Sequence, residues 1–305
     1  MYKRQINATP NEYLSTLPVR DADRIAYLSA NVPNPFAGLL PTTAAAALQG
    51  ANIARERLLR PYPQFDAVNT TTNEGESWYN ALQVTLQRRF AGGYTLSSSY
   101  TYSHFEEATE FLNAGDPEPW KGVSSADSPH RLTVNGIWEV PVGRGRRFGA
   151  DVNGVVSAFI SGWQFSGIYT YQSGFPIGFG NIIFTGDLDD IALPASEQTV
   201  ARWFNTDAGF NKVSTQQLGS NVRTFPLRLE NVRTDNVSNV DLSLIKNTQV
   251  GGKTIELRFD SLNALNHPYF PGPNTTPTAV PFGTISASTQ LNYARRTQVS
   301  VKFLF

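Results

Sequence analysis

The chain has 305 residues, and its 25 Lys and Arg balance its 25 Asp and Glu, so the formal net charge is zero. This balance argues against nucleic acid as the main partner, because nucleic acid calls for a basic protein face. The absence of cysteine excludes disulfides, thiolate metal sites and a cysteine nucleophile, and only 16% of the residues are charged, against roughly 25% in an ordinary soluble domain.

The first 75 residues form an irregular region in which prolines recur. Two helical stretches are predicted there, near residues 22–30 and 42–59. No run approaches the roughly 18 consecutive apolar residues of a transmembrane helix, and no apolar stretch of a signal peptide follows the basic residues near Met1.

From Trp78 onward, apolar and polar residues alternate with a period of two, as in Leu82, Val84 and Leu86 against Gln83 and Thr85. The alternation predicts seven strands, near residues 78–90, 94–104, 131–140, 162–173, 239–244, 254–260 and 298–305. Most have the length of about 9–11 residues that a tilted strand needs to cross a bilayer.

The predicted connections between these strands alternate in length. Short or medium connections near residues 91–93, 141–154 and 249–253 alternate with long ones that end near Pro129, span 174–238 and span 263–292. In an up-and-down sheet this pattern puts every long loop at one end, as in outer-membrane barrels. We therefore predict an all-β, antiparallel up-and-down transmembrane barrel portion, about seven strands of a larger barrel, with extracellular loops that contain short helices. Residues 1–75 are predicted to be extracellular loop, and residues 76–305 to be the barrel strands.

A soluble β-sandwich is the alternative interpretation of the same alternation. The polar positions, however, are mostly Ser, Thr, Gln and Asn rather than Lys and Glu, and aromatic residues gather near strand ends. The last strand adds a second argument, because its alternate positions end on an aromatic residue and resemble the signal that the bacterial barrel-assembly machinery reads by strand addition. This predicted assembly signal consists of Val299, Val301, Phe303 and Phe305.

An ordered set of short motifs extends over nearly the whole chain, from about residue 6 to residue 305. The motifs lie at residues 60–65, 79–83, 88–90, 99–103, 128–132, 162–164, 172–176, 203–205 and 266–268. Together they resemble the late barrel of Oar-like TonB-dependent receptors, which are carboxypeptidase-regulatory-like domain-containing outer-membrane receptors. The resemblance implies a barrel of about 22 strands that is filled by a plug domain and powered by the inner-membrane TonB complex.

The chain shows no plug, regulatory domain or TonB-contacting segment, so we expect a C-terminal fragment whose parent lies in the bacterial outer membrane and takes up a large solute or peptide. Expected partners are outer-membrane lipid, the barrel-assembly machinery, the TonB complex through the missing part, and an unidentified ligand. The alternative functions are an outer-membrane surface or adhesion-type barrel without active import and, less favoured, a soluble β-sandwich binding module.

No motif predicts an enzyme or a cofactor. His104, His130 and His267 lack the spacing of metal ligands, and no G-x-S-x-G elbow is present. The segment 143–149 is interpreted as a solvated basic periplasmic turn, because it does not match G-x-G-x-x-G.

Two groups of loop residues are candidate sites. Asp187, Asp189 and Asp190 are weak calcium candidates, with a solvated loop surface as the preferred interpretation. The aromatic residues Trp120, Phe175, Trp203 and Phe204 are predicted to face a ligand, although packing of the long loops against one another explains them equally well.

Overall fold

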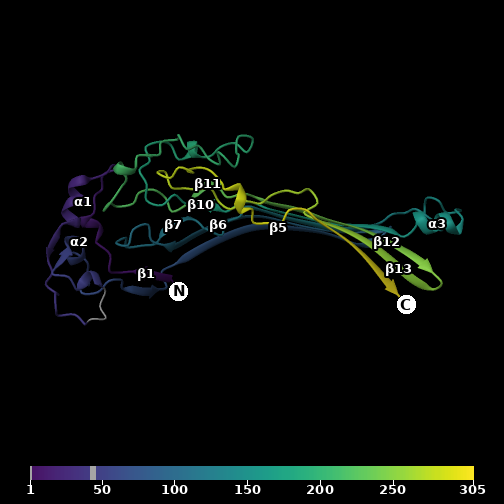
Figure 1. Ribbon diagram of the computed structural model, residues 1–305, viewed down its shortest axis with the longest axis horizontal. Coiled ribbons are helices and arrows are strands. Elements are labelled where there is room, and N and C mark those ends of the chain that lie inside the picture. The colour runs from purple at the N-terminus through teal and green to yellow at the C-terminus, as the bar shows by residue number, and fades with distance from the viewer. Residues whose placement is uncertain (1, 42–45) are drawn as a thin grey trace.

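The computed structural model describes residues 2–41 and 46–305, and its centre is one curved antiparallel sheet (Figure 1). Seven strands follow one another in the order β14-β13-β12-β9-β8-β6-β5, so each strand pairs with the next long strand of the chain. They are β5 (Glu76–Ala91), β6 (Tyr94–Glu110), β8 (His130–Glu139), β9 (Trp163–Gln172), β12 (Val237–Val250), β13 (Lys253–Leu262) and β14 (Arg296–Leu304). All seven predicted strands are confirmed, and we call this sheet the wall.

Two of the turns in the wall are built on glycine pairs. Gly92 and Gly93 join β5 to β6, and Gly251 and Gly252 join β12 to β13, all four with positive φ between 58° and 87°. Glycine adopts this backbone conformation without a steric penalty, and such tight turns match the right-handed twist of paired strands.

The remaining elements are short and lie in the connections. The strands are β1 (Tyr2–Gln5), β2 (Asn31–Pro33), β3 (Asn52–Ala54), β4 (Asn69–Thr72), β7 (Trp120–Val123), β10 (Pro176–Ile177) and β11 (Leu229–Arg233). The α-helices are α1 (Ala22–Ser29), α2 (Arg55–Leu58) and α3 (Gly154–Ile160), and 3₁₀ turns occur at Asn11–Tyr13, Ala46–Leu48, Asp189–Ile191, Ser214–Gln216 and Ala287–Thr289. In the described part of the chain, none of the helices is both long enough and apolar enough to cross a membrane.

One of the two helix predictions for the first 75 residues needs correction. The helix predicted near residues 22–30 is confirmed as α1. The helix predicted over residues 42–59 begins outside the described residues, and its described part is broken into a 3₁₀ turn, strand β3 and helix α2. The break occurs because β3 pairs with β2, and this pairing takes residues 52–54 out of the helix that their composition favours.

The long and short connections lie at opposite ends of the wall. The loops 111–129, 173–236 and 263–295 lie with the described part of residues 2–75 at one end, and the turns and α3 lie at the other (Figure 1). We call these the loop end and the turn end. The predicted alternation of connection length is confirmed except at the connection 140–162, which contains α3 and is longer than the connection 111–129 at the loop end.

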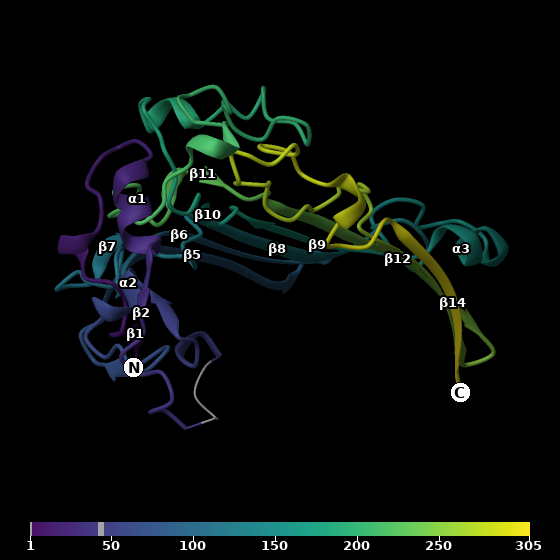
Figure 2. The same cartoon turned by 60° about the vertical axis from the view of Figure 1, so that its left-hand side comes forward.

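The wall is bent and open rather than closed on itself (Figure 2). In the described residues β5 pairs only with β6, and β14 only with β13, so both edges of the sheet are free. A transmembrane sheet must close, because an unpaired edge in lipid leaves backbone groups unsatisfied. The wall is accordingly a part of a barrel, and among the residues that the structure describes no second large sheet packs on it as a sandwich requires.

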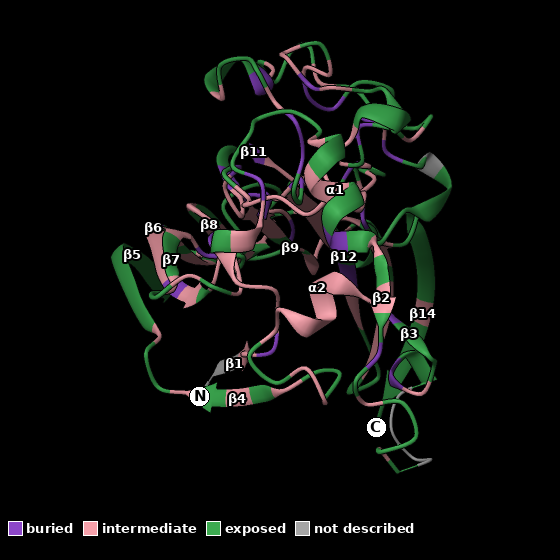
Figure 3. Cartoon of the chain, turned by 90° about the vertical axis from the view of Figure 1, so that its left-hand side faces the viewer, coloured by how far each residue is buried: buried purple, intermediate pink, exposed green. Residues whose placement is uncertain are grey.

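The hydrophobic core of the described residues lies in the loops and not on the wall. Every residue of β5 is exposed, whereas buried residues gather in the connections at the loop end (Figure 3). A soluble sheet buries one of its faces. The exposure of both faces of β5 is therefore unlike a strand of a soluble sheet, and it fits a strand of a membrane wall.

Candidate functional site

The strand register gives the wall one apolar face. Residues directly opposite each other in antiparallel strands point to the same side of the sheet. The strand pairings therefore show which residues of all seven strands share one face. The row Val84, Tyr100, Leu132 and Tyr171 is an example. The apolar face contains Leu82, Val84, Leu86, Leu96, Tyr100, Tyr102, Leu132, Val134, Trp138, Phe165, Tyr169, Tyr171, Val240, Leu242, Leu244, Ile255, Leu257, Phe259, Val299, Val301 and Phe303.

The opposite face is polar, and it is the concave one. Side chains from five neighbouring strands line a single hollow of about 630 Å³ on this face, as the inner side of a curved barrel wall is expected to show. Its lining includes Asn135 of β8, Ser166 of β9, Asp241 of β12, Arg258 of β13 and Gln298 of β14. The polar face therefore lines the lumen of the barrel, and the apolar face is the convex outside.

A charged network crosses the floor of this hollow. The Arg258 guanidinium donates from Nε to both carboxylate oxygens of Asp260, at 2.8 and 3.0 Å, and the Ser243 hydroxyl donates to the same carboxylate. Because each charge has a partner, the network presents hydrogen-bonding groups to the lumen without an isolated charge.

A second hollow, of about 510 Å³, adjoins the first towards the loop end. Asp241 and Leu262 line both hollows, and the second also includes Tyr269, Tyr293 and Arg296 from the connection 263–295 and its junction with β14. Asn263 holds this connection in place, because its amide donates to the carbonyls of His267 and Tyr293, at 3.1 and 2.8 Å. The two hollows form one polar track from the loops to the middle of the wall.

Aromatic residues of the apolar face gather near both ends of the strands. Trp78, Tyr100, Tyr102 and Tyr171 lie towards the loop end. Tyr94, Trp138, Phe165 and Phe303 lie towards the turn end. Two aromatic bands that flank an apolar zone are the arrangement of membrane barrels, in which amphipathic rings sit at the two lipid–water interfaces.

The long loops share an aromatic core. Phe204 has no exposed surface, and its ring lies 5.0 Å from Phe179 and 5.2 Å from Phe282, in edge-to-face arrangements. The core combines the connection 173–236 with Phe282 and Ile285 of the connection 263–295. Two long loops are thus packed into one body, which we call the loop core.

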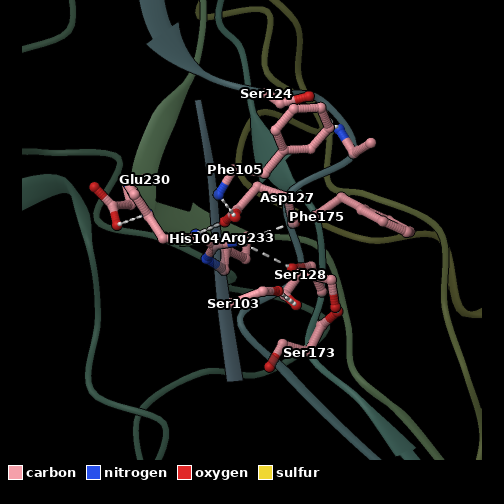
Figure 4. Close-up of polar contacts among 12 residues, drawn as sticks. Ser103, His104, Phe105, Ser124, Asp127, Ser128, Ser173, Phe175, Glu230 and Arg233 are labelled. Carbon is pink, nitrogen blue, oxygen red and sulfur yellow. Dashed lines mark hydrogen bonds and ion pairs between the residues drawn. The ribbon is translucent and has the colours of Figure 1, made fainter. Parts of the chain in front are cut away.

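A buried ion pair joins the loop core to the wall (Figure 4). Asp127 has no exposed surface; it accepts a hydrogen bond from Arg233 at 2.7 Å and another from the Phe105 backbone N–H at 2.7 Å. Arg233 also donates to the carbonyls of Asp127 and Gly174, at 3.2 and 3.3 Å. One pair therefore connects β6, the connection 111–129 and the connection 173–236.

Serine hydroxyls complete this junction. Ser103 donates to the Ser128 carbonyl at 3.2 Å, Ser128 donates to the Ser173 carbonyl at 2.9 Å, and the Ser173 hydroxyl accepts from the His130 N–H at 3.2 Å (Figure 4). The Ser128 and Ser173 carbonyls and the His130 N–H lie where the strands end. The serine hydroxyls give these backbone groups hydrogen-bond partners there.

Arg223 supports the loop core in a similar way. Its guanidinium donates to the carbonyls of Phe225 and Pro226, at 2.8 and 2.7 Å. Burial lowers the pKa of Arg223 from its ordinary value, an effect that Glu110 nearby opposes. A guanidinium stays protonated at neutral pH, so Arg223 remains a cation that ties the loop together.

The four aromatic residues predicted to face a ligand are placed differently from one another. Phe204 is fully buried, and Trp203 is buried with its indole N–H donating to the Arg233 carbonyl at 2.6 Å. These two residues pack the loops, as the alternative interpretation describes. Phe175 is half-buried, and Trp120 is exposed on β7, so a ligand-facing role stays a prediction for these two.

The calcium candidates do not converge. Among residues 2–41 and 46–305, no group of three or more His, Asp or Glu side chains is placed to hold a metal ion. Asp187 instead accepts from the Asp189 N–H at 3.0 Å, and the Asp190 carbonyl accepts from Asn205 at 3.0 Å. These contacts shape a 3₁₀ turn, and the carboxylates belong to the loop surface.

The predicted assembly signal lies on the outer edge strand. Val299, Val301 and Phe303 share the apolar face of β14, and Phe305 directly follows the strand. Recognition of these residues by the assembly machinery stays a prediction.

The residues of the two hollows and of the junction that the sequence analysis did not single out are Asp241, Arg258, Asp260 and the pair Asp127 and Arg233. For Arg258 and Asp260 a signal was present, because opposite charges two positions apart in a strand point to the same face. Asp127 and Arg233 are 106 positions apart, and no local pattern connects them.

Comparisons with known proteins agree with this geometry. A family model described as "Outer membrane beta barrel domain" matches residues 4–298, which include the N-terminal loop region, the loop core and most of the wall. No curated protein and no solved structure matches at a significant level.

Proposed function

Because the chain belongs to the outer membrane beta barrel domain family, we propose that it is the C-terminal wall of a TonB-dependent receptor that takes up a large solute or peptide. The family supports the outer-membrane location. The transport role is supported by the resemblance of the sequence motifs to Oar-like receptors. The residues singled out act by binding and positioning, so we propose no enzymatic activity and no cofactor.

The polar track is the observation that carries this proposal. It joins two hollows of about 510 and 630 Å³ on the concave face, and it runs from the loop residues Tyr269 and Tyr293 to Asp260 and Gln298 in the wall. Charged groups, amides and tyrosines offer many hydrogen bonds. A surface of this kind suits a polar solute or peptide that must bind and then move on.

The proposed partners follow from the two faces of the wall. Lipid contacts the convex apolar face, the barrel-assembly machinery pairs with the exposed edge of β14, and the TonB complex acts through a plug that the lumen encloses. The unidentified ligand contacts the loop core and the polar track.

An uptake assay tests the transport role. Bacteria that carry the full-length protein are given fluorescent peptides of graded length, with and without a protonophore that collapses the inner-membrane proton gradient. We expect uptake that needs the gradient and that falls several-fold in a Tyr293→Ala variant, because a tyrosine at a contact surface often carries much of the binding energy. Ser99→Ala, on the same polar face but outside both hollows, is the matched control. Uptake that is unaffected by the protonophore contradicts TonB-dependent import.

A surface or adhesive role is the second candidate function, and the loop core favours it. This body is packed around buried aromatic residues, and the Asp127–Arg233 pair fixes it to the wall, so it presents a preorganised outer surface. Binding of a ligand to cells without any accumulation inside them, in the same assay, selects this role over transport.

A further inference from the structure

The connection between β8 and β9, residues 140–162, leaves large apolar side chains exposed at the turn end. Val155 and Phe159 of α3 are 72% and 73% exposed, and Val156 and Phe148 are exposed as well. Positions 155, 156 and 159 lie on one side of a helix, so these three side chains form one apolar surface. A seven-residue helix that faced only water would not be expected to carry such a surface.

This connection folds over the convex face of the wall. Lys246 belongs to the apolar face through its pairing with Trp163 and Leu257, yet the residue is only 8% exposed. The connection covers it, because the ammonium group donates to the Ser161 carbonyl and lies 5.7 Å from the centre of the Trp163 ring. The helix is therefore on the side of the wall that faces lipid, near the end of β12 (Figure 2).

Several contacts hold α3 rigidly in that position. The Trp163 indole N–H donates to the Phe159 carbonyl at 2.9 Å, and the Asn247 N–H donates to the Gly162 carbonyl at 2.8 Å. Gly162 has a φ of 72°, and a Cβ atom there would lie 2.2 Å from the Asn247 carbonyl oxygen, so only glycine fits this close approach. The exposed apolar surface is thus presented by an anchored element.

The same connection also carries several cations. Arg144, Arg146 and Arg147 lie within four positions, and the only acidic residue of the connection is Asp151. The connection therefore has three positive charges and one negative charge. In the described part of the chain, only Arg146 of these three arginines has a carboxylate partner, Glu139 at 3.2 Å.

We propose that residues 140–162 form an interfacial anchor, in which Val155, Val156 and Phe159 insert between phospholipid acyl chains and Arg144 and Arg147 contact lipid phosphates. The connection combines apolar side chains with arginines and directly adjoins the strand ends that carry Trp138 and Phe165 of the turn-end aromatic band, a combination that matches the boundary between acyl chains and headgroups. The proposal rests on the membrane wall and does not need TonB-dependent import.

Site-specific fluorescence tests the anchor, and the chain has no cysteine of its own to interfere. Phe159→Cys in the full-length protein is labelled with an environment-sensitive fluorophore and reconstituted in vesicles of phosphatidylethanolamine and phosphatidylglycerol. Some vesicles contain phospholipid with a nitroxide quencher near the headgroup. We expect blue-shifted emission that the shallow quencher lowers by about half, since an interfacial helix is buried only to the headgroup–acyl boundary.

Two further labels make the outcomes separable. Phe65→Cys, at an exposed phenylalanine of the N-terminal loop region, serves as the matched control and is expected to stay unquenched. Val84→Cys lies on the apolar face in the middle of β5 and reports on the wall through a deep quencher. Quenching at Val84 without quenching at Phe159 overturns the anchor alone, whereas the absence of quenching at both positions overturns the membrane wall itself.

A charge variant tests the role of the arginines. In the Phe159→Cys background, Arg144→Gln with Arg147→Gln is expected to reduce the quenching in vesicles with phosphatidylglycerol, and to reduce it less in vesicles of neutral phosphatidylcholine, where the electrostatic attraction is smaller. Blue-shifted emission at Phe159 that no lipid quencher affects indicates contact with protein and contradicts the proposal.

Discussion

At the scale of single residues, the stability of the loop core depends on how buried charges are paired. Asp127 is fully buried, and Arg233 supplies its charge partner while also bonding two carbonyls. The attraction within such a pair mainly offsets the cost of removing both ions from water, so the pair adds little net stability while it is intact. Removing one partner is different, because the other charge is then left buried and unpaired.

We expect Asp127→Ala to destabilise the junction by about 3–5 kcal/mol, the usual cost of breaking a buried pair. Asp127→Asn keeps an acceptor for the Phe105 N–H and is expected to cost less. Hydrogen exchange of residues 174–236 measures the effect, and those amides should exchange faster in the alanine variant than in the asparagine variant. Equal exchange in wild type and Asp127→Ala would show that the pair does not hold the loop core.

Asp21 gives a prediction for acid pH, because it caps α1. Its carboxylate accepts from the Arg24 backbone N–H at 2.9 Å, and this bond, with the Ser15 hydroxyl, lowers the pKa of Asp21 from its ordinary value. A lowered pKa stabilises the folded form above the unfolded value, and that stability is lost as the pH falls through the folded pKa.

We therefore expect the amides of residues 22–29 to lose protection as the pH falls from about 6 to about 3, after correction for intrinsic exchange rates. Asp21→Ser retains a cap without a titratable group, so its protection should not change with pH in this range. A pH dependence that persists in the serine variant would assign the effect to another group.

At the scale of elements, β14 combines an edge of the sheet with an apolar face. Val299, Val301 and Phe303 point to the convex side, while Ser300, Lys302 and Leu304 point to the lumen. An exposed strand edge pairs by its backbone, and side chains at alternate positions give specificity.

We expect Phe303→Ser to reduce the amount of folded protein in the outer membrane several-fold, because it removes an aromatic residue from the predicted assembly signal. Leu304→Ser changes a neighbouring apolar residue on the opposite face and serves as the matched control. Heat-modifiable mobility on gels measures the folded fraction. A larger loss in Leu304→Ser than in Phe303→Ser would contradict the predicted signal.

At the scale of the whole molecule, the separation of long loops and short turns sets the orientation. The two longest connections, 173–236 and 263–295, lie at one end of the wall with the described part of residues 2–75, and the glycine turns and α3 lie at the other. Long extracellular loops and short periplasmic turns are the rule in bacterial barrels. We therefore predict that the loop end faces the cell exterior.

Cysteine accessibility on intact cells checks this orientation. Val213→Cys in the connection 173–236 is expected to react with a membrane-impermeant thiol reagent, since Val213 is exposed at the loop end. Gln249→Cys, beside the turn between β12 and β13, is expected to react only after the outer membrane is permeabilised. The opposite result would invert the topology.

The strands and their two faces were predictable from the sequence because they depend on local properties. Alternation with a period of two at Leu82, Val84 and Leu86 requires a strand with one apolar face, and paired glycines require a turn. The helix predicted over residues 42–59 was wrong in its described part, because the pairing of β3 with β2 is a contact between residues about twenty positions apart. Trp203 and Phe204 were ambiguous for the same reason, since composition does not distinguish a ligand surface from a core.

The sequence by itself thus determined a seven-stranded meander with an apolar and a polar face and with its long loops at one end. Only the tertiary structure decided that the polar face is concave and carries a track lined by Asp241 and Arg258. It also decided that Phe204 packs inside the loops and that α3 lies over Lys246 on the lipid side. The physical reason is that alternation and turns act between near neighbours, whereas curvature, loop packing and ion pairing join residues that the chain brings together only when it folds.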